Sequence, residues 1–593
     1  MNTVHTHKRH RRGMILVGVM MVLMMLMAFM LAGIGGTAGL SDVTRNSLHL
    51  TRKRSASYQA QNLADIGIRA VLQWISVQAG PPSQMTPFRP SQAAAFWTGT
   101  TANGNYDRIT FTAPNGDTIG TIDVRILPAA NNDVNALKSY AIESVGTYQG
   151  LKQVVRAVIL QDTFARYAYF ADNAPTGSFW AGGNSAFTGP VHVNARNTFA
   201  SDPAYNINAG FKLLWRRQPW WDPNSPGTVP IFQFTGDGAF TTSASAGKVQ
   251  YFKNTTTNQE APSGADWNFV ARGGQSTMRT DQPMVDMPTE TNRQQDAALG
   301  TPPASVPAGP SVTVPSNGGA TSGGIYINGD VDNMRMIPGD SDSRIQNIEI
   351  IQNDGVRKIK TYITVNPINE TVSIQRSQTP NLTSNIYTNV GSATTLAGRT
   401  NGVVYVNGNI GKPSVPNPSN PNGAPLTAAS GGLSGWISNN VMSGTTIVKQ
   451  NAWTVATPPD KTVNLNGAIS HTSLDGANRP TTASGMFGVV AGKIQFTMEL
   501  PNNSRMHAIL MANDTINAEG ALSRSVATVG LYGGMIQKNP GVLAGFGADA
   551  LQYTGVGINR NYDPRVASTP PPFFPTTGNQ FRVVSYQRVA SEI

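Results

Sequence analysis

The side chains best suited to metal chemistry are few and lie far apart along the 593-residue chain. The sequence has no cysteine, so neither a disulfide nor a thiolate metal site can form. Beyond the first fifty residues the histidines are His192, His471 and His507, and none belongs to a His-Glu-x-x-His motif. We expect these three side chains to pack in the fold or lie at its surface, and we predict no catalytic residue, no metal and no cofactor.

Aspartates are densest in one short stretch, as Asp330, Asp332, Asp340 and Asp342. Alternating aspartates in a glycine-containing loop can supply the oxygen ligands that Ca²⁺ prefers. No glutamate closes this loop at the spacing of an EF-hand, so the pattern favours solvated turns. A weak calcium site over Asp330–Asp342 stays open as the alternative.

Aromatic side chains lie next to arginines in one segment, which contains Trp215, Arg216, Arg217, Trp220, Trp221 and Asp222. Such neighbours can bind sugars or nucleic acid by stacking. Aromatic packing within a surface loop explains the same composition, and we favour it.

The usual signatures of an enzyme do not occur in their required context. Gly545-Phe546-Gly547 and Gly555-Val556-Gly557 do not link a strand to a helix as a dinucleotide site requires, and neither a phosphate loop nor a nucleophile elbow is present. We predict that the protein is not an enzyme. The alternative is an anchored polysaccharide-active enzyme on a β-helix, which would need a cleft of clustered carboxylates or basic residues.

The basic residues of the chain are spread out except at its start. The formal net charge is +11, and four positive charges lie within residues 1–13, as Lys8, Arg9, Arg11 and Arg12. A nucleic-acid partner would require a clustered basic patch in the body of the chain. We therefore expect no nucleic acid among the partners.

The strongest pattern in the sequence is an uncharged apolar run over residues 14–34, from Met14 to Ile34. About twenty helical residues span the hydrocarbon core of a bilayer. The basic residues before this run place the N-terminus in the cytoplasm, although Arg45 and the basic residues 52–54 follow it. We predict a single-pass helix in the cytoplasmic membrane; a signal peptide cleaved near Gly36 is the competing interpretation.

The helical pattern continues beyond the apolar run. No proline occurs between Ser41 and Gln78, and Leu63, Ile66, Ala70 and Trp74 recur at helical spacing. Gly80-Pro81-Pro82 then ends the pattern. The sequence predicts one transmembrane and amphipathic helix over residues 14–80.

These features together resemble a type IV prepilin. The segment Arg12-Gly13-Met14-Ile15-Leu16, followed by Ala60-Gln61-Asn62-Leu63-Ala64-Asp65-Ile66-Gly67, is similar to the N-terminal region of PilX-like minor pilins. The resemblance implies that residues 1–13 are a basic prepilin leader and that a prepilin peptidase cuts between Gly13 and Met14. It also implies that Met14 is N-methylated and that the helix packs against other pilin subunits. Gly18 stands where major pilins have glutamate. A subunit that lacks this glutamate is more similar to a minor or tip component.

A small antiparallel sheet is predicted after the helix, within a pilin-like β domain over residues 81–170. Alternating apolar and polar residues, separated by glycine and asparagine, indicate four strands, over 106–112, 121–126, 140–146 and 153–160. A helix laid across such a sheet would bury the apolar faces of both.

A large β-rich passenger is predicted over residues 171–593, where Gly and Pro are frequent and alternating aliphatics followed by asparagine recur. Copies of this unit begin at Val191, Ile325, Val404 and Val463. They predict either tight hairpins, as in a sandwich, or the rungs of an interrupted parallel β-helix. Pro/Gly-rich insertions are expected at 297–324 and 411–435.

The predicted fold class is therefore mainly β with a long N-terminal helix: a pilin-like helix and antiparallel sheet, followed by a β-helix-like or sandwich passenger. The predicted function is that of a minor or tip pilin, which contributes to pilus assembly or adhesion, first in the cytoplasmic membrane and then at the cell surface. A pseudopilin-like part of a secretion machine is a further alternative.

Overall fold

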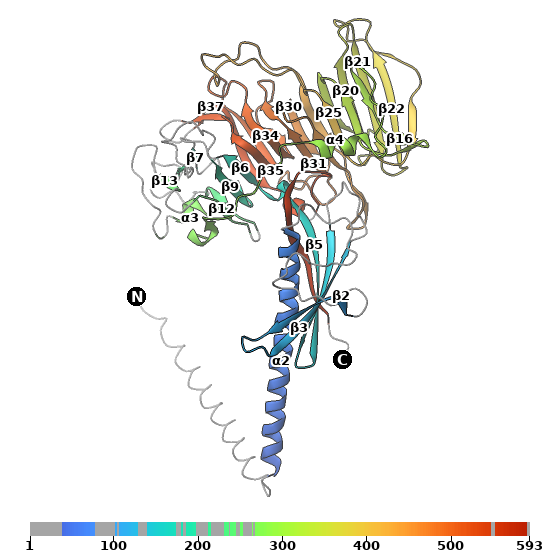
Figure 1. Cartoon of the computed structure of the whole chain (residues 1–593). Coiled ribbons are helices and arrows are strands. Elements are labelled where there is room, and N and C mark those ends of the chain that lie inside the picture. The colour runs from blue at the N-terminus through green and yellow to red at the C-terminus, as the bar shows by residue number, and fades with distance from the viewer. Residues whose placement is uncertain are drawn as a thin grey trace, which may run out of the picture.

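The computed structural model describes residues 38–76, 101–102, 106–128, 139–173, 179–181, 186–196, 212–214, 230–235, 238–244, 249–252, 264, 267–546, 552–567 and 569–589. Two bodies are visible in Figure 1: a helix with a small sheet, and a large β domain above them. The leader of residues 1–13, the apolar run of 14–34 and Gly80-Pro81-Pro82 lie outside the described residues.

The long helix, α2, spans Ala38–Ser76. The four glycines between Gly33 and Gly39 disfavour a helix, and α2 begins among them. Its second half buries a stripe at helical spacing, which contains Ala56, Ala60, Leu63, Ala64, Ile68, Val71 and Ile75. The preceding residues 45–55 are exposed on every side of the helix.

A six-stranded antiparallel sheet packs against the buried stripe of α2. Its strands, in spatial order, are β1 (Thr101–Ala102), β2 (Tyr106–Thr112), β3 (Thr118–Pro128), β4 (Ser139–Tyr148), β5 (Leu151–Thr163) and β38 (Thr576–Val589). Ile122, Val124 and Tyr140 are fully buried between helix and sheet. The four strands expected from the sequence lie within β2, β3, β4 and β5.

Glycines allow α2 to approach the sheet closely. A Cβ atom added to Gly146 on β4 would lie 2.6 Å from the backbone nitrogen of Ala64 and would overlap the carbonyl oxygen of Ala60. A Cβ added to Gly67 on the helix would lie 2.8 Å from a methyl group of Ile122 and would overlap Ser144. Backbone therefore meets backbone at this interface, which only glycine permits.

The C-terminal strand β38 returns to this small sheet and pairs with β5, so that Val583 lies opposite Ile159 and Val589 opposite Val154. The predicted passenger range of 171–593 included β38, whereas the structure pairs this strand with the small sheet. The large β domain, residues 164–575, is thus an insertion between two neighbouring strands (Figure 1).

Parallel strands form the long sheet of the large β domain. Their spatial order is β18 (Ile325–Asn328), β25 (Val403–Asn407), β29 (Ala452–Ala456), β31 (Met486–Ala491), β34 (Ile509–Ala518), β35 (Ala527–Pro540), β6 (Tyr169–Asn173), β9 (Val191–Arg196), β12 (Phe240–Thr242) and β14 (Met278–Arg279).

The spatial order of these strands differs from their order in the sequence. The chain enters at β6, in the middle of the row, and runs outward to β14. It then crosses to the opposite end at β18 and runs back to β35, which pairs with β6 through Met535 and Tyr169. The small sheet and helix therefore attach near the middle of the row, as Figure 1 shows.

A second set of parallel strands faces the first across one apolar core. It contains β19 (Asn333–Pro338), β26 (Gly432–Ile437), β30 (Thr462–His471), β32 (Lys493–Phe496), β33 (Ser504–Met506), β37 (Gln552–Tyr562), β8 (Phe187–Thr188) and β11 (Phe232–Gln233), together with parts of β34 and β35. Aliphatic side chains such as Val404, Val455 and Leu510 stack in register inside. Burial of these rows supplies the main driving force for folding.

Two repeats recognised in the sequence stack directly on each other. Ile325–Asn328 pairs with Val404–Asn407, and beyond the corner Val331 pairs with Ile410. At the corner the Asn407 side-chain amide donates to Asn328 Oδ1 over 3.2 Å. Stacked asparagines therefore bridge the turns of successive layers.

The outer face of the long sheet is covered as well. The crossing segment contains α4 (Asn292–Leu299), which packs on β18 and β25. Ala297 and Ala298 of α4 belong to a second buried cluster, with Tyr326, Tyr405 and Phe574 of the C-terminal return. Part of the predicted insertion at 297–324 is therefore buried and covers the outer face of the long sheet.

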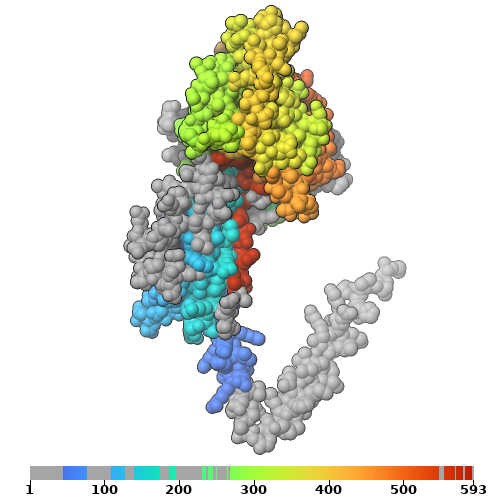
Figure 2. Space-filling view, turned by 90° about the vertical axis from the view of Figure 1, so that its right-hand side faces the viewer, coloured from blue at the N-terminus to red at the C-terminus, as the bar shows by residue number. Residues whose placement is uncertain are grey.

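Antiparallel strands end the row beyond β19. They are β20 (Gln346–Asn353), β21 (Lys358–Asn366), β22 (Thr371–Gln378) and β24 (Thr394–Ala397), which we call the hairpin region. Figure 2 shows this yellow-green part of the surface at the end of the molecule remote from the blue helix. The hairpins cover the end of a sheet that would otherwise expose an unpaired edge.

The predicted fold class is wrong in the form given above. The helix that the structure describes spans Ala38–Ser76, and a multi-sheet β-rich domain dominates the described chain. That domain does not follow the small sheet as a β-helix-like or sandwich passenger; it is inserted into the sheet, and its strands are out of sequence order. The physical reason is the pairing of β5 with β38 and of β6 with β35, which no local pattern encodes.

Candidate functional site: the helix, its sheet and the double connection

The residues predicted for processing and membrane insertion cannot be placed. Gly13, Met14 and Ile34 lie outside the described residues, as does the aromatic segment of 215–222. Within the described part of the chain, no helix has both the length and the apolar character needed to cross a bilayer.

The three isolated histidines all lie in the packed interior of the large β domain. His192 shares hydrogen bonds with Thr241 Oγ1 at 2.7 Å and Asn194 Oδ1 at 2.9 Å, and burial lowers its pKa. His471 stacks on His507, and burial lowers the pKa of both, that of His507 to about 4. The lowered pKa values keep the three imidazole rings neutral, and neutral rings can pack in the core.

The aspartates of the predicted calcium alternative have separate partners. Asp342 holds Arg344 at 2.6 Å, and this hydrogen bond lowers the pKa of Asp342. Asp330 accepts from the backbone nitrogen of Asn409 at 2.7 Å, and Asp332 accepts from Asn353 at 3.2 Å. Among the described residues, no group of three or more potential metal ligands comes together.

The exposed first half of α2 is the most unusual surface of the small body. Leu48 and Leu50 are each more than half exposed, and Arg52, Lys53 and Arg54 follow them on the same free-standing segment. Helices in proteins gain most of their stability from tertiary packing, and this segment has no such packing within the described chain. It therefore presents a surface that another element can cover.

Side chains fasten the embedded half of α2 to the sheet. Tyr586 of β38 donates a hydrogen bond to Asp65, and Gln153 of β5 donates to Ser57 Oγ at 3.0 Å. The strand that closes the chain thus also holds the helix.

The chain passes between the two bodies twice, after β5 and before β38. This double connection contains a buried carboxylate. Asp162, at the end of β5, pairs with Arg166 just beyond the strand and with Arg582 of β38, whose Nε lies 3.1 Å from Asp162 Oδ1. Burial raises the pKa of Asp162, and the two arginines partly counteract this rise. One carboxylate thereby links the outgoing chain to the returning chain.

Backbone hydrogen bonds reinforce this connection. The backbone nitrogen of Phe164 donates to the carbonyl of Pro575 at 3.0 Å, and the Gln161 side chain donates to the carbonyl of Gly578 at 3.0 Å. Two adjacent, cross-linked strands hold the inserted domain more firmly than a single linker would. The geometry therefore suits a stalk that presents the large β domain in a defined orientation.

Sequence reasoning missed the connection because its parts are 420 residues apart. Nothing in the local sequence of β38 identifies β5 as its partner. The available signal was an acid at the end of an apolar strand, Asp162, and an arginine near the end of the chain, Arg582.

No protein-family model matches the chain, and no curated protein matches it by sequence. Among solved structures, the chain is similar to the competence-associated pilin ComZ from Thermus thermophilus, with 14% identity over 90% of this chain and 97% of that chain. The TM-score is 0.25, so this likeness carries no argument about fold or function.

Proposed function

We propose that this protein is a type IV pilin-like structural component whose helix and small sheet form a stalk that displays the large β domain. The double connection through β5 and β38 carries this proposal, because it joins the β domain to the stalk at two cross-linked strands. Its work is non-covalent, and we propose no catalysis.

The stalk is anchored, in this proposal, by the apolar residues 14–34, with the N-terminus in the cytoplasm. The prepilin peptidase cuts between Gly13 and Met14, and other pilin subunits then cover the exposed helix around residues 45–55. The size of the β domain and Gly18 in place of glutamate support a minor or tip position, where the domain serves adhesion or the start of assembly.

The mature N-terminus tests this proposal. The full-length chain would be produced with and without a prepilin peptidase, and the intact mass and N-terminal peptide would be measured by mass spectrometry. The expected product begins at N-methylated Met14 only when the peptidase is present, and a Gly13→Val variant stays uncut.

A cut near Gly36, or an unprocessed Met1 in both samples, would refute pilin processing. Antibodies against the large β domain, applied to intact and permeabilised cells, test display separately. We expect labelling of intact cells; labelling only after permeabilisation would contradict the proposed orientation.

A further inference from the structure

Exposed aliphatic side chains lie at one end of the hairpin region. The turn that joins β20 to β21 exposes Val356, and the loop after β22 exposes Leu382 and Ile386, with exposed fractions of 69%, 40% and 78%. Ile359 of β21 pairs with Gln378 of β22, so this turn and this loop are at the same end of the strands. Single exposed aliphatic residues are ordinary, whereas several at one end of a structure indicate a contact surface.

Side-chain contacts bring the loop against the start of β21. The ammonium group of Lys358 donates to Asn385 Oδ1 at 2.8 Å. The ammonium group of Lys360 lies 4.4 Å from the centre of the Tyr387 ring and 3.7 Å from Glu349 Oε2. The turn and the loop therefore form one surface, which we call the tip surface and define as Val356, Arg357, Lys358, Leu382 and Ile386.

Local hydrogen bonds hold both segments in shape. The carboxylate of Asp354 accepts from the backbone nitrogens of Val356 at 2.9 Å and Arg357 at 2.8 Å. In the loop, the Asn381 side chain accepts from the backbone nitrogen of Ser384 at 2.9 Å. Side chains of Asp and Asn that bond the backbone in this way fix the course of a turn. The aliphatic side chains are thus exposed by ordered turns.

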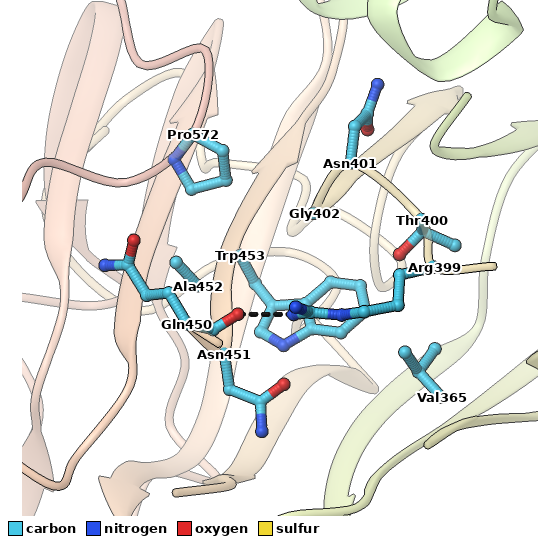
Figure 3. A pocket seen from close by; sticks show the side chains of 10 residues that line it. All are labelled: Val365, Arg399, Thr400, Asn401, Gly402, Gln450, Asn451, Ala452, Trp453 and Pro572. Atoms are coloured by element: carbon cyan, nitrogen blue, oxygen red, sulfur yellow. Dashed lines mark hydrogen bonds between the residues drawn. The ribbon is translucent and has the colours of Figure 1, made fainter. Parts of the chain in front are cut away.

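The opposite end of the same strands contacts the rest of the large β domain. There Val365 of β21 lines a small pocket beside Arg399, which donates to the carbonyl of Gln450 at 2.5 Å (Figure 3). Glu370, in the turn after β21, pairs with Lys449 at 2.7 Å. Within the described chain, the tip surface is therefore the exposed end of a region that lies remote from the helix (Figure 2).

The tip surface carries positive charge. Arg357 pairs with Asp354 at 3.0 Å, whereas no carboxylate of the described chain forms an ion pair with Lys358. The loop adds no acid, because residues 377–398 contain no charged side chain. Lys358 is therefore available to an anionic partner beside the exposed aliphatic residues.

We propose that the tip surface docks on an anionic lipid surface, with its aliphatic side chains among the acyl chains and Lys358 at the phosphate groups. Binding of this kind combines buried apolar area with attraction to anionic headgroups. The composition argues against a protein partner, because protein interfaces are depleted in lysine and their strongest contacts seldom use valine or leucine. This inference goes beyond the proposed display function, which names no binding target.

The test mixes the full chain, held by residues 14–34 in discs of phosphatidylcholine, with acceptor vesicles of equal parts phosphatidylglycerol and phosphatidylcholine. A chain that does not enter the discs is mixed with the vesicles directly, so failure of the proposed anchor is seen separately. Sedimentation measures the bound fraction, with empty discs as the blank. We expect binding at least about tenfold weaker to vesicles of phosphatidylcholine alone, and weaker binding as salt is added.

Matched variants locate the binding surface. Ile386→Ser should weaken binding at least about tenfold, because an aliphatic side chain no longer enters the lipid. Leu426→Ser is the control, since Leu426 is 65% exposed in a different loop, and binding should be unchanged. Lys358→Gln keeps a donor for Asn385 and should weaken binding to the anionic vesicles about fivefold, whereas Lys412→Gln should not.

Three results would overturn the proposal. The first is no binding to the anionic vesicles, or equal binding to both kinds of vesicle. The second is an equal effect of Ile386→Ser and Leu426→Ser. The third is clustering of the discs without acceptor vesicles that Ile386→Ser abolishes, which would identify a second copy of the chain as the partner.

Discussion

At the scale of single residues, buried polar side chains connect parts of the chain that lie 91 to 368 positions apart. The Gln537 side-chain amide donates to the hydroxyl of Tyr169 at 3.2 Å, across the junction between the late and early strands. Asn194 accepts from the backbone nitrogen of Val285 at 2.8 Å and so fixes the crossing segment. Such groups favour one arrangement because leaving any of them unpaired is costly.

The stacked pair His471 and His507 predicts acid sensitivity of the large β domain. The pKa of His507 is lowered to about 4, mainly by burial, with Arg505, Arg565, Asp563 and His471 as its charged or titratable neighbours. A base with a depressed pKa in the folded state takes up its proton more readily when unfolded. The free energy of unfolding should therefore fall as pH drops from 6.5 to 4, by up to about 3 kcal/mol for this residue.

Urea denaturation at several pH values checks this prediction. His507→Asn should flatten the pH dependence between pH 6.5 and 4, whereas His49→Gln, on the exposed part of α2, should leave it unaltered. An unchanged slope in His507→Asn would contradict the proposed cause.

The connection between stalk and β domain gives a second prediction for single residues. Arg582→Leu leaves Asp162 buried with one arginine instead of two, so unfolding should require about 2–4 kcal/mol less. The matched control is Arg335→Leu, because Arg335 is largely exposed and lies 3.8 Å from Glu349; its loss should cost about 0–1 kcal/mol. Equal effects of the two substitutions in chemical denaturation would argue against a buried charge network.

At the scale of elements, the contact of α2 with the sheet depends on backbone proximity. The helix uses small residues, Ala60 and Ala64, where β4 presents Gly146, and the two backbones meet. Larger side chains elsewhere on the stripe, such as Leu63 and Ile68, fill the space to either side. The angle and depth of the helix are thus set by a few small residues rather than by average hydrophobicity.

Gly146→Ala should separate α2 from the sheet. The added methyl group would overlap the carbonyl of Ala60, so we expect a loss of about 1–3 kcal/mol and faster proteolysis of the helix. Gly476→Ala is the control, because a Cβ there meets no atom within 4 Å and its backbone is not left-handed. If both variants unfold at the same denaturant concentration, the close approach is not what holds the helix.

At the scale of the whole molecule, the insertion makes stalk and β domain separable in principle. Thr163 and Thr576 lie opposite each other where β5 ends and β38 begins. The chain therefore leaves and re-enters the small sheet at a single point, and the two bodies have separate apolar cores. Domains with their own cores and closely spaced ends usually tolerate such excision.

Excision of residues 164–575 tests this separation. Joining Thr163 to Thr576 by Asn-Gly should turn β5 and β38 into an ordinary hairpin, because a two-residue turn of this type fits the strand twist. We expect the shortened chain to fold cooperatively, with helix and strand signals in circular dichroism. The separate fragment 164–575 should fold as well; an unfolded stalk beside a folded fragment would mean that the β domain is needed to close the small sheet.

The sequence by itself determined the local elements. The spacing of apolar residues was sufficient for the helical pattern of 41–78 and for the strands of the small sheet, because these periods follow from backbone geometry. The repeated aliphatic units at Ile325 and Val404 likewise marked strands that pair in register.

Only the tertiary structure decided which strands meet. The pairings of β5 with β38 and of β6 with β35 join segments that are far apart in the sequence, so no period or motif predicts them. Hydrogen bonds between strands are chemically alike for every partner. Partner choice therefore comes from the burial and packing that the whole chain achieves at once.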